Sequence, residues 1–123
     1  RMRNSFSVSS VAQAAALAAL DDHDHIEAAV SNNASQAPVL RGGLTELGHR
    51  CLPTAANFLY CNFGEDAAAL AARLRGEGIS VRPLGTWGAP TCLRVTIGAP
   101  EENRLFLAAM RKIGGVSHPE GPR

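Results

Sequence analysis

The hydrophobic pattern at the start of the chain predicts a helix that is apolar almost all the way round. Residues 11–20 read VAQAAALAAL, with one polar position, and alanine and leucine are strong helix formers. Ser10 and Gln13 have the spacing of a capping box, in which the serine side chain accepts an orphan N–H. A helix without a polar face is expected to be covered on several sides, so in a chain this small part of the cover has to come from elsewhere.

A second helix is predicted to follow, with Asp24 as its N-cap and Glu27 as the partner in the capping box. An apolar stripe at helical spacing then continues toward Gly48. It consists of Ile26, Val30, Ala37, Leu40, Leu44 and Leu47. Pro38 and the glycine pair at 42–43 weaken this helix, so the pattern predicts that it is kinked or split.

The middle of the chain predicts a strand and then a helix. Residues 53–63 are rich in aromatic side chains of β character. Asp66 opens the next helix, which ends at Gly76 and Gly78. Its apolar face is formed by Ala67, Leu70, Ala71 and Leu74.

Two further strands are predicted at residues 79–82 and 91–97, on either side of a loop rich in glycine and proline. Pro100 then suits the first turn of a last helix, because the N–H that proline lacks is unpaired there anyway. The buried stripe of this helix is expected to be Phe106, Ala109, Met110 and Ile113. Residues 114–115 are both glycine and stop it, and residues 116–123 are expected to form a loose tail.

The order of these elements is two helices followed by β-α-β-β-α. It predicts an α+β fold, with a small sheet of about three strands covered by helices on one face. One domain over residues 1–115 and a tail over residues 116–123 are expected. The chain begins at Arg1 rather than at a methionine, which suggests a piece of something longer.

Composition excludes several classes of protein. The chain has 123 residues, 46% of them hydrophobic, and a formal net charge of +1, with arginines scattered along it. These values favour a globular domain and argue against nucleic-acid and membrane partners. The longest apolar run is too short for a bilayer, and no basic segment precedes it as in a signal peptide.

The cysteines and histidines give no metal-binding pattern. Cys51, Cys61 and Cys92 form no CxxC motif, so they are interpreted as small buried apolar residues of a reduced, cytoplasmic protein. His23 and His25 lie two residues apart and would diverge on a helix. No further histidine or cysteine completes a set of ligands with them.

Two arginines are candidates for binding an anion. Arg94 alternates with Leu93, Val95 and Ile97, so it points away from the face that those three residues share. Arg82 ends the strand before it. A guanidinium fixed on a rigid strand can grip an anionic ligand bidentately. An ordinary solvated arginine shows the same pattern, and geometry alone favours that plainer interpretation.

Several motifs resemble those of the histidinol-phosphate aminotransferases. They are ANFL at 56–59, GISVRP at 78–83, LRVTIG at 93–98 and PEEN at 100–103, and FSVSSVAQAAALAALDD at 6–22 resembles the helix that enters the small domain of the same enzymes. Five segments in the family's order cover nearly the whole chain except the tail. The family belongs to the fold-type I, class I/II aminotransferases, and this chain resembles its C-terminal small domain.

The resemblance implies roles for four residues. Arg94 matches the arginine that holds the anionic end of the substrate, and Arg82 matches a second arginine that helps to grip the substrate phosphate. Asn57 matches an asparagine that faces the active-site cleft, although a strand asparagine bonded to a neighbouring loop is about equally plausible. Trp87 matches an aromatic residue of the substrate pocket, or else it caps the core.

The sequence also departs from the family. Transamination by pyridoxal phosphate needs a lysine that binds the cofactor covalently, and the chain's only lysine is Lys112, at the end of the last helix. In such enzymes that lysine and most cofactor ligands lie in the large domain. No catalytic residue is therefore expected in this chain. Residues 31–38 also differ from the uninterrupted helix that the family usually has there.

The resemblance implies the small domain of a pyridoxal-phosphate-dependent transaminase. Two arginines favour histidinol phosphate as substrate, an aromatic amino acid is an alternative, and an activity like threonine-phosphate decarboxylase is a weaker one. The expected partners are the missing large domain and, in the whole enzyme, a second subunit. A stand-alone module that binds anions or a protein partner remains a hypothesis of a different class.

Overall fold

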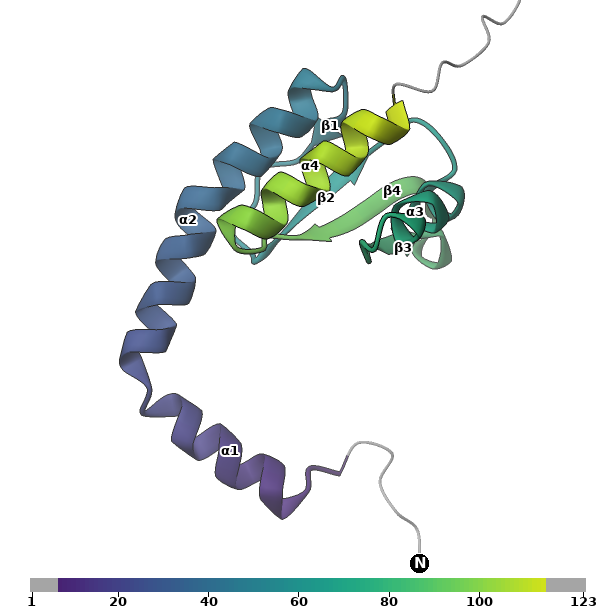
Figure 1. Ribbon diagram of the computed structural model, residues 1–123. Helices are drawn as coiled ribbons and strands as arrows, with labels where there is room; N and C mark the ends of the chain where they lie inside the picture. The colour runs from purple at the N-terminus through teal and green to yellow at the C-terminus, as the bar shows by residue number, and fades with distance from the viewer. Residues whose placement is uncertain (1–6, 115–123) are drawn as a thin grey trace, which may run out of the picture. The chain divides into compact units, whose positions relative to one another are not determined.

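The computed structural model describes residues 7–114, which form helices and one sheet (Figure 1). The expected tail at 116–123 lies outside the described residues. The elements follow in the order α1 (Ser10–Leu20), α2 (His23–Glu46), β1 (Arg50–Cys51), β2 (Phe58–Asn62), α3 (Ala67–Gly76), β3 (Arg82–Leu84), the 3₁₀ helix η1 (Gly85–Trp87), β4 (Ala89–Thr96) and α4 (Pro100–Gly114). This arrangement confirms the predicted α+β class.

The chain divides into two compact units, residues 1–31 and residues 32–123. The described part of the first unit holds α1 and the beginning of α2, and none of its residues is buried. Val11, Leu17 and Leu20 are each more than 60% exposed, so α1 has apolar side chains on its surface and no core of its own. The sequence predicted this need for cover.

Both N-terminal caps lie one or two residues before the predicted positions. Ser9, not Ser10, caps α1, because its Oγ accepts the N–H of Ala12 at 3.2 Å. Before α2 it is Asp22, not Asp24, whose Oδ1 accepts the N–H of His25 at 3.1 Å. The capping residue must have a non-helical backbone conformation, and a sequence with several suitable side chains in a row does not determine which of them adopts it.

Helix α2 runs without interruption through Pro38, so the predicted split is wrong. Its second half is held by burial, since Leu40 and Leu44 are fully buried in the core of residues 32–114. Gly43 allows a close approach to α4, because a Cβ built there would lie 2.6 Å from Cδ1 of Leu107. Tertiary packing therefore outweighs the weak helix propensity of this segment.

The sheet is antiparallel throughout and has the strand order β1-β2-β4-β3. It has four strands, one more than the sequence indicated, because β1 is two residues long and too short to show alternation. The strand predicted at 53–63 is confined to β2, and the strand predicted at 79–82 begins only at Arg82. β4 begins at Ala89, two residues before the predicted start.

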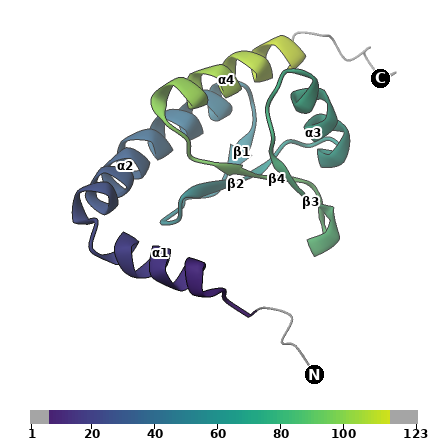
Figure 2. The same cartoon turned by 60° about the horizontal axis from the view of Figure 1, so that its bottom comes forward.

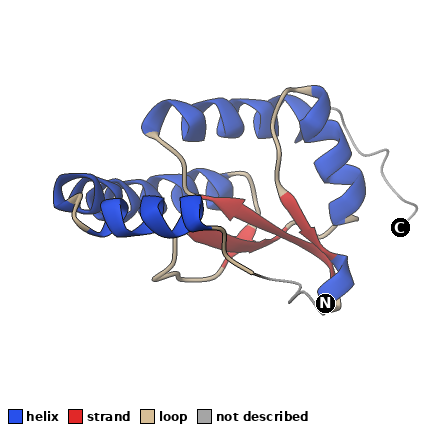
Figure 3. Ribbon diagram, turned by 90° about the horizontal axis from the view of Figure 1, so that it is seen from below, coloured by secondary structure: helices blue, strands red, loops and turns tan. Residues whose placement is uncertain are grey.

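Helices α3 and α4 lie on the same face of the sheet (Figures 2 and 3). Together with the second half of α2 they enclose one hydrophobic core. Its fully buried residues include Leu40, Leu44, Leu59, Cys61, Leu70, Leu74 and Leu93. Asp66 caps α3 as predicted, with its Oδ1 accepting the N–H of Ala69 at 2.7 Å.

The turn from β4 into α4 is fixed by Asn103, the one buried polar residue among the described ones. Its Oδ1 accepts the N–H of Gly98 at 3.0 Å, and its Nδ2 donates to the Gly98 carbonyl and to Oε1 of Gln36 on α2. These bonds satisfy the amide and fasten the end of β4 to two helices.

Cys51 and Cys61 form a disulfide, which corrects the interpretation of all three cysteines as reduced. The two residues are directly opposite each other on β1 and β2, with their Cα atoms 4.1 Å apart. The flanking bond from Leu52 N to Tyr60 O indicates that they are a non-hydrogen-bonded pair, the closer of the two antiparallel pair types. Cys92 remains a buried thiol.

No helix within residues 7–114 is long and apolar enough to cross a bilayer.

Candidate functional site

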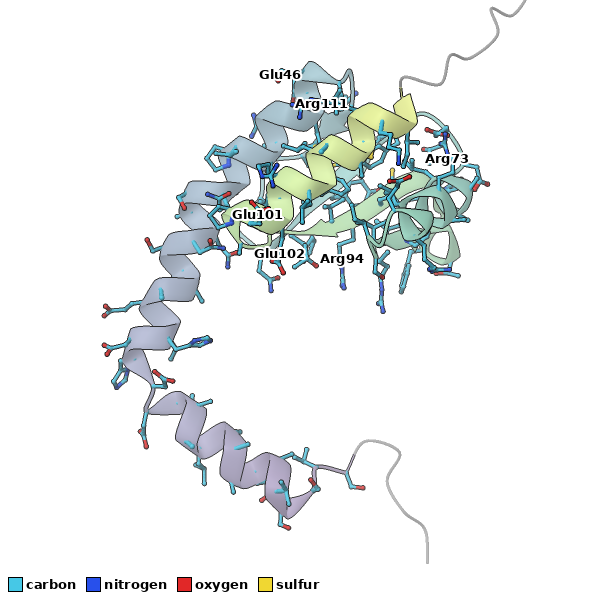
Figure 4. All side chains as sticks on the ribbon, in the orientation of Figure 1. Glu46, Arg73, Arg94, Glu101, Glu102 and Arg111 are labelled. Carbon is cyan, nitrogen blue, oxygen red and sulfur yellow. A yellow bond between two sulfur atoms is a disulfide. The ribbon has the colours of Figure 1, made fainter. Side chains whose placement is uncertain are left out.

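Strand β4 sorts its side chains between two faces of the sheet. Leu93 and Val95 are buried in the core, and Arg94 between them is only half-buried. Figure 4 shows Arg94 projecting on the side of the sheet opposite to α4. The predicted direction of this side chain is therefore confirmed.

The strand pairing places Arg82 directly opposite Arg94. On the other side of β4, Tyr60 of β2 is also opposite Arg94. Because directly opposed residues of antiparallel strands project on the same face, the two guanidinium groups and the phenol lie in one row across three strands.

This face carries an open cavity of about 430 Å³. Three of the four candidate site residues line it: Arg82, Trp87 and Arg94. The remaining lining residues are Phe58, Tyr60, Leu84 and Ala89. The cavity is thus formed by aromatic and aliphatic side chains around two cations.

Each guanidinium lies near the face of an aromatic ring. Cζ of Arg94 is 5.4 Å from the ring centre of Phe58, and Cζ of Arg82 is 5.7 Å from that of Trp87. At these separations a cation is attracted by the negative face of the ring. Gly88, with a φ of +78°, ends η1 directly after Trp87, in a conformation that glycine adopts without strain.

No acidic side chain lines the cavity. The ion pairs formed within residues 7–114 are Arg73–Glu65, Arg104–Glu101 and Lys112–Glu77, none of which involves Arg82 or Arg94. Like charges directly opposite each other on neighbouring strands repel. The cavity is therefore a positively charged, aromatic-lined site whose charge an anion would balance.

Asn57 does not line this cavity. It is exposed and lies just before β2, where its backbone carbonyl accepts the N–H of Ile97 at 2.9 Å. Its backbone lies at the end of the sheet, next to Phe58, outside the cavity that the arginines line.

Phe58 and Tyr60 line the cavity but were interpreted from the sequence only as residues of β character. A signal for them was present, because Leu59 and Cys61 alternate with them and point to the core. The interaction of the Tyr60 phenol with the Cys92 thiol, followed by desolvation, raises the pKa of Tyr60.

Lys112 does not belong to this site. Its Nζ donates to both carboxylate oxygens of Glu77, at 2.7 and 2.9 Å, near the end of α4. It lines a different, larger cavity of about 950 Å³, together with the Arg73–Glu65 pair and His49. The one lysine of the chain is thus already paired with a carboxylate and does not meet the arginines, so the residues present do not fit a covalently held pyridoxal phosphate.

Known proteins of one family are similar to this chain. The family model described as aminotransferase class I and II matches residues 1–110. A histidinol-phosphate aminotransferase 2 of Pseudomonas aeruginosa is 43% identical over 92% of this chain, and a histidinol-phosphate aminotransferase of Paramagnetospirillum magneticum is 43% identical over 94%. The chain covers 31% and 33% of these two relatives, about a third of their length.

Two solved structures have the same fold. The histidinol-phosphate aminotransferase of Sinorhizobium meliloti, in complex with pyridoxal-5'-phosphate, superimposes on 93% of this chain with a TM-score of 0.71 and 29% identity. That of Clostridium acetobutylicum covers 92% with a TM-score of 0.78 at 22% identity. The chain corresponds to 32% and 35% of those two structures.

Proposed function

Because this chain belongs to the class I and II aminotransferases, we propose that it is the substrate-binding small domain of a pyridoxal-phosphate-dependent transaminase of histidine biosynthesis. The substrate is histidinol phosphate, and 2-oxoglutarate receives the amino group. The names of the relatives support the substrate, and the positively charged cavity supports the role of this part of the enzyme.

The observation that carries the proposal is the uncompensated Arg82–Arg94 pair on the open face of the sheet. A phosphate monoester has three terminal oxygens and close to two negative charges, so it can accept charge-assisted bonds from both guanidinium groups at once. A carboxylate has two oxygens and one charge, which a single arginine already satisfies. The pair therefore favours a phosphorylated substrate over an aromatic amino acid.

The aromatic rings give the cavity its second property. Arg94 lies over the ring of Phe58 and Arg82 over the ring of Trp87, and Leu84 adds an apolar side chain to the lining. The negative ring faces attract the two cations and help to hold them in place. The Tyr60 phenol, directly opposite Arg94 and part of the same lining, offers a further hydrogen-bonding group for the anion.

The chemical step takes place outside this chain in our proposal. Pyridoxal phosphate would supply the electron sink for amino transfer, and it would be held by the part of the enzyme that this chain does not span. That same part would cover the apolar surface of α1, and the complete enzyme would work as a cytoplasmic homodimer. The 123 residues alone are expected to be inactive.

Trp87 provides a direct test, because it is the only tryptophan and it lines the cavity. Titration of the 123-residue chain with a phosphate monoester should change the tryptophan fluorescence, whereas acetate should bind at least about tenfold more weakly. Arg94→Ala should reduce the affinity for the phosphate monoester at least about tenfold. Arg75→Ala, which removes an exposed arginine of α3, is the matched control and should have no effect.

Equal losses from the two variants would contradict a specific site. In an enzyme of the same length as its relatives, Arg94→Ala should raise KM for histidinol phosphate much more than it lowers kcat or cofactor content. Phosphate binding by a full-length protein that has no transaminase activity would instead support the stand-alone anion-binding module.

A further inference from the structure

The disulfide between Cys51 and Cys61 lies at the edge of the sheet and outside the anion-binding cavity. It joins β1, which has only two residues, to β2. Disulfides of cytoplasmic proteins are mostly transient, because cellular thiols reduce them. The proposed cytoplasmic location therefore favours a disulfide that is reduced and re-formed. The thiol chemistry itself does not depend on the transaminase proposal.

The two sulfur atoms differ in their surroundings. Cys61 is fully buried, whereas Cys51 is half-buried on the edge strand. Cys51 is therefore the more accessible of the two residues, and in the proposal below a reductant approaches the bond from its side. Among the described residues β1 pairs only with β2, so β1 is held by the disulfide, the short ladder and the packing of Cys51 against the core.

The third cysteine is separated from this pair by the sheet itself. Cys61 is opposite Leu93 of β4, and both point to the core. Cys92 directly precedes Leu93 on β4 and points to the other face. Successive residues of a strand project on opposite faces, so Cys92 cannot exchange with the disulfide while the sheet is intact. The structure thus provides one pair that can react and one cysteine that serves as an internal reference.

We propose that Cys51 and Cys61 are a reversible thiol–disulfide site that responds to dithiol reductants and controls the order of residues 52–57. A thiolate of the dithiol attacks Sγ of Cys51, the Cys51–Cys61 bond breaks, and the Cys61 sulfur leaves and takes up a proton. The second thiol then attacks the mixed disulfide and releases Cys51 as a thiol. Two electrons and two protons pass to the protein, and the dithiol becomes a cyclic disulfide.

The bond affects residues 52–57 because it holds their first end. Leu52 N donates to the Tyr60 carbonyl directly after the disulfide, and Thr54 Oγ1 donates to the Phe58 carbonyl at 2.8 Å. At the other end Asn57 accepts from Ile97. Reduction removes the covalent link at the first end. Residues 52–57 then gain conformational freedom, including Asn57 at the end of the sheet.

The redox state can be measured on single peptides of the 123-residue chain. Trypsin cleaves after Arg50 and Arg73, so Cys51 and Cys61 fall in one peptide, residues 51–73. Cys92 falls in a different one. After incubation in dithiol buffers of graded potential and alkylation of free thiols, the 51–73 peptide should change from unalkylated to doubly alkylated, while Cys92 should remain a thiol throughout.

The consequence can be followed by hydrogen exchange of the native chain. The amide of Leu52 should exchange on the order of 10- to 100-fold faster after reduction, because the closed loop no longer limits the opening of the segment. Cys51→Ser should show the fast rate in both buffers. Cys92→Ser, the matched control, should still respond to reduction.

Two results would overturn the proposal. One is a 51–73 peptide that is doubly alkylated even in the oxidising buffer, since the bond would then not form in solution. The other is a bond that resists excess dithiol in the native chain and is reduced only after unfolding. The chemical reduction of the unmodified chain decides both, so the test does not depend on the folding of the serine variants.

Discussion

Neighbouring residues of the strands point to opposite faces of the sheet, and the two faces have different roles. On the helix-covered face, Leu59, Leu93 and Val95 are almost completely buried among other apolar side chains. On the open face, side chains of β2, β3, η1 and β4 contribute two like charges and three aromatic rings around a cavity. A step of one residue along β4 changes the surroundings from a core to a charged site.

The difference separates stability from binding. Burial of apolar area on the covered face contributes favourable free energy of folding. On the open face, repulsion between the opposed arginines lowers the stability of the fold, and a bound anion would restore it. Substitutions on the two faces should therefore affect different measurements, and the following predictions test that separation from the largest expected effect to the smallest.

Leu93→Ala should lower the free energy of unfolding by about 2–5 kcal/mol, because it leaves a cavity in a fully buried site. Arg94→Ala, one residue away, should change it by less than about 0.5 kcal/mol. Urea unfolding followed by circular dichroism measures both. Similar losses for the two variants would mean that the faces do not divide stability from binding.

Gly43→Ala and Gly42→Ala test the packing that covers the apolar face. A Cβ at Gly43 would lie within 3 Å of two methyl carbons of Leu107, whereas nothing lies within 4 Å of one at Gly42. Gly42→Ala should therefore stabilise the protein by up to about 1 kcal/mol. Gly43→Ala should be about 1–3 kcal/mol less stable than Gly42→Ala, as judged from the midpoints of thermal unfolding.

The reverse order of those two midpoints would show that α2 and α4 are not in close contact at this point.

Phe58→Leu tests the contribution of the aromatic ring on the open face. It removes the ring 5.4 Å from Arg94 and keeps an apolar side chain of similar size. The affinity for a phosphate monoester should fall by about two- to fivefold, corresponding to about 0.5–1 kcal/mol. Phe58→Tyr retains the ring and should restore the affinity, whereas a loss in both variants would point to general damage to β2.

The pKa of His49 predicts that the stability of the protein depends slightly on pH. Burial beside the ring of Phe63, 4.6 Å away, lowers the pKa of His49 from its usual 6.5, and the Glu65 carboxylate opposes this in part. The unfolded chain therefore binds the proton more readily, and stability should fall as the pH drops below about 6.5. His49→Gln should flatten this slope in urea titrations between pH 5 and 7.

An unchanged slope in His49→Gln would assign the acid sensitivity to the carboxylates. Binding of the phosphate monoester should not depend on His49, because it lies outside the arginine cavity.

The sequence predicted the elements whose pattern is long and regular. α3 and α4 begin at the predicted cap and proline, and the alternation in β4 gave the direction of Arg94. The chain's short or interrupted elements were predicted less well. β1 has no periodicity to detect, and α2 contains residues that favour a break, so both depend on contacts with distant residues.

The site divides in the same way. The motifs indicated Arg82, Arg94 and Trp87 separately, and each of the three lines the cavity. Their sequence spacing could not show that Arg82 and Arg94 are directly opposite each other, because that depends on the register between β3 and β4. It also could not show that Phe58 and Tyr60, more than 20 residues earlier, complete the lining.

What the sequence by itself determined is local: which residues alternate, where most helices begin, and which family's motifs the chain carries in order. What only the tertiary structure decided is which of these local features meet. The register across β2, β4 and β3 places two cations beside aromatic rings, and the pairing of β1 with β2 places Cys51 against Cys61. Such meetings depend on contacts between residues far apart in the chain, which no local pattern encodes.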